Sequence, residues 1–133
     1  MDINVSLNKL KVVSSVVKQS DFEKIEFDSR KVGAGDMFVA IVGTTSDGHD
    51  FIETAIGGGA KMIVCEKMPE KLHDDVSYIQ VESSSEALGI LASDYYGNPS
   101  SKLKLVGVTG TNGKTTIAGT LYNLTRKLGY KVG

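Results

Sequence analysis

The sequence has very few of the residues that build disulfide frameworks and metal clusters. Its 133 residues include one cysteine, Cys65, and two histidines. A single cysteine cannot form an internal disulfide, and with only two histidines it forms no ligand cluster of the kind that metal-binding motifs require. A fold held together by disulfides or by a structural metal is therefore excluded.

An excess of charge of one sign is also missing. Lysine and arginine number 15 against 16 aspartates and glutamates, which gives a formal net charge of −1, and the two signs alternate along the chain. This pattern offers no basic stripe for a nucleic-acid backbone and no polybasic patch for a membrane surface. We therefore expect no nucleic-acid partner.

Long hydrophobic runs are absent as well. The longest apolar runs have the length of a strand, far short of the ~20 residues that a membrane span needs. The N-terminal residues 1–4 lack the cationic start and apolar segment of a secretory signal. Hydrophobic residues nevertheless make up 41% of the chain, enough to bury a core. We expect a globular cytoplasmic protein without membrane insertion, whose oligomeric state the sequence does not indicate.

Strand-like segments recur in the first hundred residues. Each shows either the two-residue period of a half-buried strand or the continuous apolar run of a strand buried on both faces. The segments are residues 24–27, 37–42, 62–65 and 76–81. Because helix-like segments alternate with them, the sequence predicts an α/β fold with a largely parallel or mixed sheet.

Two helices are predicted in the same part of the chain. The first begins at Asp50, an N-cap residue with Glu53 three positions later in a capping-box-like pair, and ends at the glycines of residues 57–59. The second follows the serines of residues 83–85 and ends at the turn formed by residues 97–99. That turn also suits a linker between domains.

After the turn, the strand–helix pattern begins again. Residues 103–108 are predicted as a strand, and an amphipathic helix is predicted from about Lys114 to Gly129. One strand and one helix cannot bury a core. We therefore predict a substrate-binding domain in residues 1–100 and the beginning of a truncated ATPase domain in residues 101–133. The alternative is that this strand and helix complete the first sheet.

A glycine-rich segment, residues 107–116, connects the last strand to its helix. Glycines let successive backbone N–H groups surround a polyphosphate, and the helix N-terminus adds unpaired donors. In such a loop Lys114 would reach the β- and γ-phosphates, and the Thr115 hydroxyl would ligate Mg²⁺. The general phosphate-loop pattern has glycine where this sequence has Val108, so the loop is a shorter-spaced form. The alternative is an ordinary turn that begins a helix.

The sequence of this loop, residues 108–116, resembles the ATP loop of the Mur ligases, which form amide bonds in peptidoglycan precursor synthesis. Upstream segments strengthen the resemblance to the N-terminal domain of two kinds of Mur ligase. These segments are residues 28–32, 35–40, 43 and 47–51. One kind adds a diamino acid as the third peptide residue, and the other adds D-alanyl-D-alanine. Residues 95–100, leading into residues 105–113, match the diamino acid-adding kind better.

The resemblance implies a reaction and its cofactors. A Mur ligase of this kind would use ATP and Mg²⁺ to join meso-diaminopimelate or L-lysine to UDP-N-acetylmuramoyl-L-alanyl-D-glutamate through an acyl phosphate. Lys114 would be the catalytic group that this chain supplies. The family's metal-binding and amino acid-binding residues lie further along its sequences, so the 133 residues alone are expected to be inactive.

The resemblance also implies two sets of binding residues. The ATP-binding residues would be Gly110, Thr111, Asn112, Gly113, Lys114, Thr115 and Thr116, with Thr115 also the metal ligand. The UDP-substrate-binding residues would be Phe27, Ser29, Arg30, Thr44, Thr45 and Ser46. Hydroxyl groups and loop N–H groups suit phosphate and uracil, and an arginine adds positive charge.

Structural interpretations of the same residues remain open. Residues 28–30 also fit a turn with a surface ion pair, and residues 47–50 fit a turn before a helix cap. His49 fits a structural hydrogen bond as well as a ligand contact, whereas Cys65 and His73 have no predicted site role. For the whole chain, the alternatives are the D-alanyl-D-alanine-adding ligase and a stand-alone nucleotide-binding module.

Overall fold

The computed structural model describes residues 1–133, which fall into two units, Met1–Ser101 and Lys102–Gly133. The first unit is built on a five-stranded sheet with the strand order β1-β5-β4-β3-β2. The strands are β1 (Val12–Val16), β2 (Ile25–Glu26), β3 (Met37–Val39), β4 (Met62–Cys65) and β5 (Ser77–Val81). Strands β2 to β5 are parallel, and β1 pairs antiparallel with β5 at one edge. The predicted α/β fold with a largely parallel or mixed sheet is therefore confirmed.

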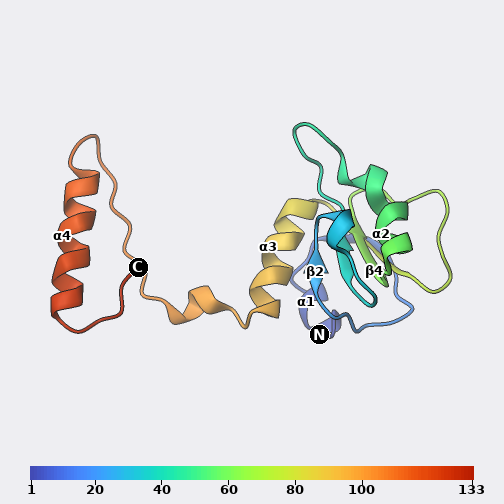
Figure 1. Ribbon diagram of the computed structural model, residues 1–133, viewed down its shortest axis with the longest axis horizontal. Coiled ribbons are helices and arrows are strands. Elements are labelled where there is room, and N and C mark those ends of the chain that lie inside the picture. The colour runs from blue at the N-terminus through green and yellow to red at the C-terminus, as the bar shows by residue number, and fades with distance from the viewer. The chain divides into compact units, whose positions relative to one another are not determined.

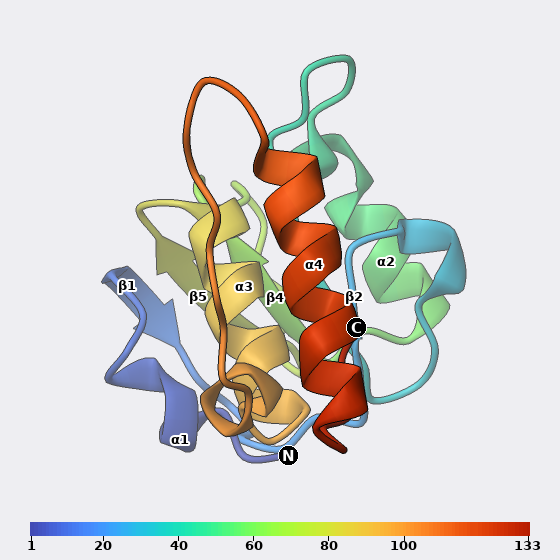
Figure 2. The same cartoon turned by 90° about the vertical axis from the view of Figure 1, so that its left-hand side faces the viewer.

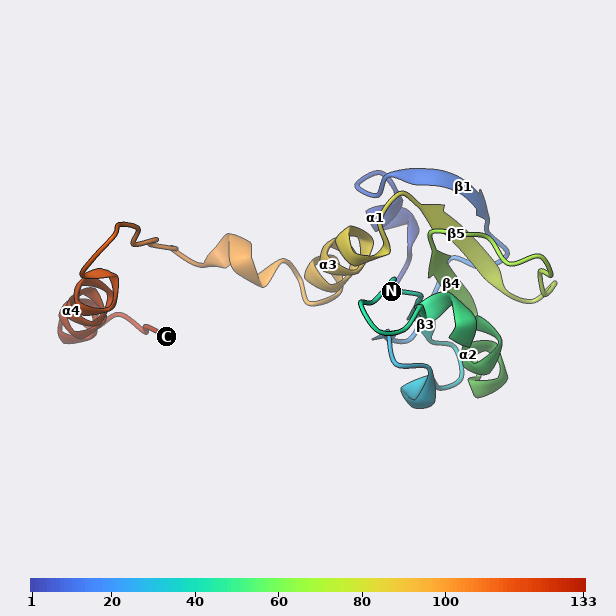
Figure 3. The same ribbon diagram turned by 90° about the horizontal axis from the view of Figure 1, so that it is seen from above.

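Helices cover both faces of this sheet (Figure 3). Helix α2 (Ile52–Gly58) connects β3 to β4 and packs on one face, where it contributes Ile52 and Ala55 to a buried cluster. Helix α3 (Ser84–Tyr95) follows β5 and packs on the other face together with the short α1 (Asn4–Leu7). A parallel sheet needs this double cover, because both of its faces are apolar.

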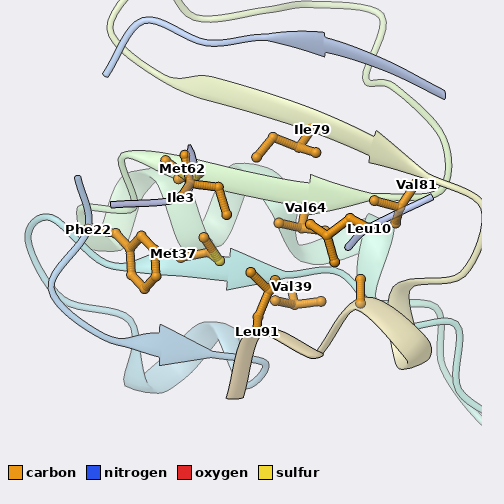
Figure 4. Close-up of a cluster of buried hydrophobic side chains, with 11 residues drawn as sticks. Ile3, Leu10, Phe22, Met37, Val39, Met62, Val64, Ile79, Val81 and Leu91 are labelled. Carbon is orange, nitrogen blue, oxygen red and sulfur yellow. The ribbon is translucent and has the colours of Figure 1, made fainter. Parts of the chain in front are cut away.

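The apolar runs of the central strands divide between the two faces by the two-residue period of a strand. In β3, Met37 and Val39 belong to the cluster under α3, whereas Phe38 belongs to the cluster under α2. In Figure 4, the Leu91 side chain of α3 lies beside Val39. The prediction of a strand buried on both faces at residues 37–42 is confirmed for residues 37–39, which are at most 1% exposed, whereas the strand ends at Val39 and Val42 is 47% exposed.

The start of the first predicted helix differs from the expectation, whereas its end is confirmed. Asp50 is not the cap; Asp47 is, because its carboxylate accepts a hydrogen bond from the His49 backbone N–H at the start of η2, a 3₁₀ turn (Gly48–Phe51). Helix α2 then begins at Ile52 without a side-chain cap. It ends at the predicted glycines, with Gly59 in the left-handed region at φ = 111°.

The second unit contains one helix, α4 (Lys114–Lys127), which begins where the sequence predicts. The predicted strand at residues 103–108 is wrong, and residues 130–133 likewise form no strand. A strand exists only through hydrogen bonds to a neighbouring strand, and residues 102–133 provide none. The predicted apolar face of α4 is present, but Ile117 and Leu128 on it are exposed.

Two elements near the N-terminus, α1 and β1, have no counterpart in the sequence-based prediction. Strand β1 is an edge strand in which Val12 and Val13 are exposed. Its sequence, two valines, two serines and a valine, lacks the two-residue period that predicts a strand. None of the helices is both long enough and apolar enough to cross a membrane.

Candidate functional site

The segments that follow the parallel strands emerge at one edge of the sheet. Residues 27–31 follow β2, residues 40–47 follow β3, Glu66 follows β4 and residues 82–84 follow β5. Open α/β sheets bind ligands at this carboxyl edge, because loops and helix starts bring unpaired polar groups together there. The loop after β3 extends beyond the start of α2 (Figure 1; Figure 2). The carboxyl edge is therefore the candidate binding site of the first unit.

The turn after β2 exposes an aromatic ring and is ordered by one aspartate. Phe27 is 63% exposed, and the next residue, Asp28, caps the 3₁₀ turn η1 (Ser29–Lys31) by accepting from the Arg30 backbone N–H at 3.1 Å. The Arg30 guanidinium also donates to both carboxylate oxygens, at 2.9 and 2.8 Å. These hydrogen bonds from Arg30 lower the pKa of Asp28 to about 2.

A lysine attaches this turn to the sheet. The Lys24 ammonium donates to the Glu26 carboxylate at 3.1 Å and to the Lys31 carbonyl at 3.3 Å, and it lies 3.5 Å from the buried Asp36 carboxylate. The hydrogen bond to Glu26 is the main cause that raises the pKa of Lys24. The turn that carries Ser29 therefore has a fixed position relative to β2.

The loop after β3 forms a narrow hairpin. Val42 and Asp47 pair as an antiparallel bridge, and the Gly43 N–H donates to the Ser46 carbonyl at 3.0 Å. The three residues at the tip, Thr44, Thr45 and Ser46, are exposed. Hydroxyl groups at this tip are therefore free to contact a ligand at the carboxyl edge.

A histidine connects this hairpin to the end of β4. The His49 ring nitrogen Nδ1 lies 2.6 Å from the Asp47 carboxylate, and Nε2 accepts from the backbone N–H groups of Glu66 at 2.8 Å and Lys67 at 3.2 Å. The Glu66 carboxylate in turn accepts from the N–H and hydroxyl of Ser84 at 2.8 Å, which lowers its pKa. The backbone hydrogen bond from His49 is the main cause that lowers the pKa of Asp47.

The sequence left open whether His49 makes a structural hydrogen bond or a ligand contact, and the structure shows hydrogen bonds within the fold. His49 makes hydrogen bonds within the fold at both ring nitrogens, which is the structural alternative. The ion pair between Asp28 and Arg30, also an alternative, is present too. Lys24 and Glu66 were not singled out from the sequence. The only signal for Glu66 was a carboxylate placed directly after a buried strand.

The six predicted UDP-binding residues divide between the two segments just described. Phe27, Ser29 and Arg30 belong to the turn after β2, and Thr44, Thr45 and Ser46 form the hairpin tip after β3. Because β2 and β3 are adjacent and parallel, both segments lie at the carboxyl edge. The His73 ring, by contrast, lies 3.1 Å from the Glu53 carboxylate of α2, outside these segments.

The glycine-rich loop of the second unit has backbone conformations that require glycine. Gly110 has φ = 149° and Gly113, the N-cap of α4, has φ = 79°, which L side chains rarely adopt. No side chain caps the N-terminus of α4, and its first turn contains no acidic residue. The Lys114 ammonium donates to the Gly110 carbonyl across the loop. Unpaired N–H groups beside a lysine fit a bound polyphosphate.

The ATP-binding residues predicted from the sequence all lie in this loop or in the first turn of α4. Gly110, Thr111, Asn112 and Gly113 form the loop, and Lys114, Thr115 and Thr116 begin the helix. All seven are exposed. The chain has no group of three histidine, cysteine, aspartate or glutamate side chains that could hold a metal ion, so a magnesium ion here would depend on Thr115 and on the phosphates of a nucleotide.

Comparison with known proteins gives one family and named relatives. Residues 21–96 match the model of the "Mur ligase family, catalytic domain". A UDP-N-acetylmuramoyl-L-alanyl-D-glutamate--2,6-diaminopimelate ligase from Cytophaga hutchinsonii is 59% identical over 114 residues, 85% of this chain and 24% of the relative. The ligase of the same name from Bacteroides fragilis is 48% identical over 132 residues, 99% of this chain and 27% of the relative.

Solved structures lead to the same family. The MurF ligase from Thermotoga maritima in complex with ADP is 38% identical over 79% of this chain and 23% of that chain, with a TM-score of 0.53. A UDP-N-acetylmuramoylalanyl-D-glutamyl-2,6-diaminopimelate--D-alanyl-D-alanyl ligase from Acinetobacter baumannii is 29% identical over 76% of this chain and 22% of that chain, with a TM-score of 0.55. This chain spans about a quarter of the length of the relatives it matches.

Proposed function

Because the chain belongs to the Mur ligase family, we propose that it is the N-terminal part of a ligase that joins diaminopimelate to UDP-N-acetylmuramoyl-L-alanyl-D-glutamate. The observation that carries the proposal is the identity to ligases of that name, 59% over 114 residues and 48% over 132 residues. These alignments cover most or nearly all of the chain, so they include the carboxyl edge of the sheet.

In this proposal, the first unit binds the UDP end of the substrate at the carboxyl edge. The exposed Phe27 ring is suited to stack on uracil, and the Ser29 hydroxyl at the start of η1 is suited to a hydrogen bond with the base or ribose. The hairpin tip offers the hydroxyls of Thr44, Thr45 and Ser46 to the phosphates. Arg30 adds positive charge, although Asp28 neutralises much of it.

The glycine-rich loop would bind ATP, the substrate that supplies the phosphoryl group for activating the glutamate carboxylate. Lys114 would leave the Gly110 carbonyl and pair with the phosphates, where it neutralises charge during transfer. The Thr115 hydroxyl is suited to bind Mg²⁺ together with the phosphates. The ADP complex of the Thermotoga maritima ligase supports nucleotide use by a protein of similar structure.

A second candidate is the ligase that adds D-alanyl-D-alanine. The Acinetobacter baumannii ligase named above carries this name and is 29% identical to this chain, and the MurF ligase from Thermotoga maritima is 38% identical. The higher identities to the diaminopimelate-adding ligases favour the first candidate. Both candidates hold a UDP-linked muramoyl peptide, so the binding site proposed for the first unit is common to them.

Calorimetric titration of the 133-residue chain with UDP-N-acetylmuramoyl-L-alanyl-D-glutamate tests the proposal. We expect saturable binding, and Ser29→Ala should weaken it about tenfold, because one hydrogen bond to a polar ligand group is lost. Ser15→Ala on the exposed edge strand β1 is the matched control and should bind like the unchanged chain. Absence of binding by the unchanged chain would contradict the proposed function.

A separate titration with ATP and Mg²⁺ tests the second unit. Binding that is lost in Lys114→Ala supports the nucleotide loop. If ATP binds and the UDP substrate does not, a nucleotide-binding module is the better description. The chain alone should catalyse no ligation, and ATP-dependent product formation by these 133 residues would contradict that expectation.

A further inference from the structure

We propose that His49 is a positioning residue of the UDP site, whose neutral ring holds the hairpin of residues 43–47 against the end of β4. This inference rests on the proposed function, because it assigns the hairpin tip to ligand binding. It adds a residue that makes no contact of its own with the ligand. Its role follows from the three hydrogen bonds that the imidazole makes, one at Nδ1 and two at Nε2.

The hydrogen bonds define one protonation state of the ring. Nε2 lies 2.8 Å from the Glu66 nitrogen and 3.2 Å from the Lys67 nitrogen, and both of these groups can only donate. Nε2 must therefore be an acceptor without a proton. Nδ1 lies 2.6 Å from the Asp47 carboxylate, which can only accept, so Nδ1 carries the proton. The arrangement requires the neutral Nδ1–H tautomer.

The groups on the two sides of the ring belong to different parts of the fold. Asp47 closes the hairpin through its bridge to Val42. Glu66 directly follows β4, and its carboxylate is held by Ser84 at the start of α3. The His49 side chain itself is only 11% exposed. The ring therefore ties a projecting loop to a rigid edge of the sheet.

A close backbone contact places the ring at this position. A Cβ atom on Gly48 would lie 2.6 Å from the Ile41 nitrogen, so only glycine fits at this position without a steric clash. The Gly48 N–H donates to the Ile41 carbonyl at 2.8 Å. Because Gly48 lies directly between Asp47 and His49, this contact brings both side chains to the base of the hairpin.

Preordering of the hairpin should matter for binding. A loop that is already held in one conformation loses less conformational entropy when a ligand binds than a loop that must first be ordered. The tip residues Thr44, Thr45 and Ser46 are exposed, so the base of the hairpin is where its conformation is fixed. Loss of the His49 tie should therefore weaken binding of the UDP substrate while the sheet remains folded.

Protonation of the ring should have the same effect as its removal. A proton on Nε2 would point at two backbone N–H groups and abolish both hydrogen bonds. The charged side chains that interact with the ring are Asp47 on the hairpin and Glu66 after β4, and Lys67 contributes its backbone N–H. The acceptor role of Nε2 is therefore the property to be tested by pH.

Two substitutions separate the functions of the two ring nitrogens. The amide oxygen in His49→Gln can take the place of Nε2 and accept from Glu66 and Lys67. The shorter amide in His49→Asn can take the place of Nδ1 and keep only the contact with Asp47. His73→Asn, which changes the other histidine of the chain, is the matched control, because its ring contacts Glu53 outside the carboxyl edge.

The affinity for UDP-N-acetylmuramoyl-L-alanyl-D-glutamate is measured by calorimetry at about pH 7.5 and about pH 5.5, a range in which an ordinary imidazole gains its proton. The diphosphate diester of this ligand gains no proton in this range. At the higher pH, His49→Asn should weaken binding about tenfold or more, whereas His49→Gln and His73→Asn should stay within about threefold. Acidification should weaken binding by the unchanged chain and leave His49→Gln nearly unchanged.

A thermal melt and amide exchange of Glu66 and Lys67 accompany each titration. A folded His49→Asn variant that binds as tightly as the unchanged chain would overturn the positioning role, and so would equal pH dependence in the unchanged chain and His49→Gln. If His49→Asn does not fold, the pH comparison with His49→Gln alone decides. Failure of every form, including the unchanged chain, to bind would instead contradict the proposed function itself.

Discussion

Two aspartates have nearly the same pKa but serve the fold differently. Asp28 lies in an exposed turn, where hydrogen bonds from Arg30 lower its pKa to about 2. The Asp94 side chain is 4% exposed and joins the end of α3 to α1. It accepts from Lys9 at 2.6 Å, from the Ser6 hydroxyl at 2.7 Å and from Asn98 at 3.1 Å. Only Asp94 connects elements that are distant in sequence.

Asp94→Asn should lower the stability of the first unit in a pH-dependent way. The hydrogen bond from Lys9 is the main cause that lowers the pKa of Asp94 from 3.8 to about 2. A lowered carboxylate pKa stabilises the folded state above about pH 4, and this contribution disappears as the pH falls through about 2. The free energy of unfolding, measured in urea, should therefore be clearly lower for the variant than for the unchanged chain at neutral pH. This difference should shrink as the pH approaches about 2. A difference that is constant with pH would contradict this role.

Cys65 should be unreactive in the folded chain. It is fully buried in β4, and burial raises the pKa of its thiol to about 11. Since only the thiolate attacks disulfide reagents, reaction with an aromatic disulfide near about pH 8 should be slow in buffer and rapid in strong denaturant. Fast reaction in buffer would mean that β4 opens easily.

At the scale of single elements, the C-terminus of α2 depends on one glycine. Gly59 has φ = 111°, and a Cβ atom there would lie 2.8 Å from the Ala34 Cα atom. We expect Gly59→Ala to reduce the free energy of unfolding by about 1–3 kcal/mol. Gly57→Ala is the matched control. It lies in the same helix with open space around it, so it should be neutral or stabilise by up to about 1 kcal/mol. Equal changes in the free energy of unfolding for Gly59→Ala and Gly57→Ala, measured in urea, would contradict the special role of Gly59 at the end of α2.

The elements that the sequence predicted well are those with a strong local pattern. Strand β4 is a continuous apolar run, and α3 is capped by Ser83, whose hydroxyl accepts from the Glu86 N–H. The elements that it missed depend on distant partners. Strand β1 exists because it pairs with β5, and residues 103–108 remain irregular because no strand lies beside them. Pairing is a property of the fold that local periodicity does not contain.

The candidate site follows the same division. Phe27, Ser29 and the tip residue Thr44 were predicted from the sequence motifs and the resemblance that they carry, and their use in binding stays a prediction. The geometry that holds these segments could not be predicted, because it joins residues that are far apart in sequence. Lys24 reaches Asp36, and His49 reaches the N–H of Glu66.

At the scale of the whole chain, the two units should differ in local stability. In the first unit, the central strands β3 and β4 are fully buried. In the second, α4 has no buried residue, and an isolated helix of this length is marginal in water. Amide protons of α4 should therefore exchange orders of magnitude faster than those of β3 and β4 when followed by mass spectrometry. Comparable protection would show that something covers α4.

The pairing of β1 with β5 also has a consequence for the order of events during translation. Val12 pairs with Val81 and Val16 with Tyr78, so the strand made early by the ribosome has its partner near the end of the first unit. Strands β2, β3 and β4 can associate as they emerge, because each pairs with the next along the chain. Residues 12–16 of the nascent chain therefore stay without their partner strand until β5 has left the ribosomal exit tunnel. Strand β1 precedes the other four strands of this sheet in the chain and is thus the last of them to be incorporated.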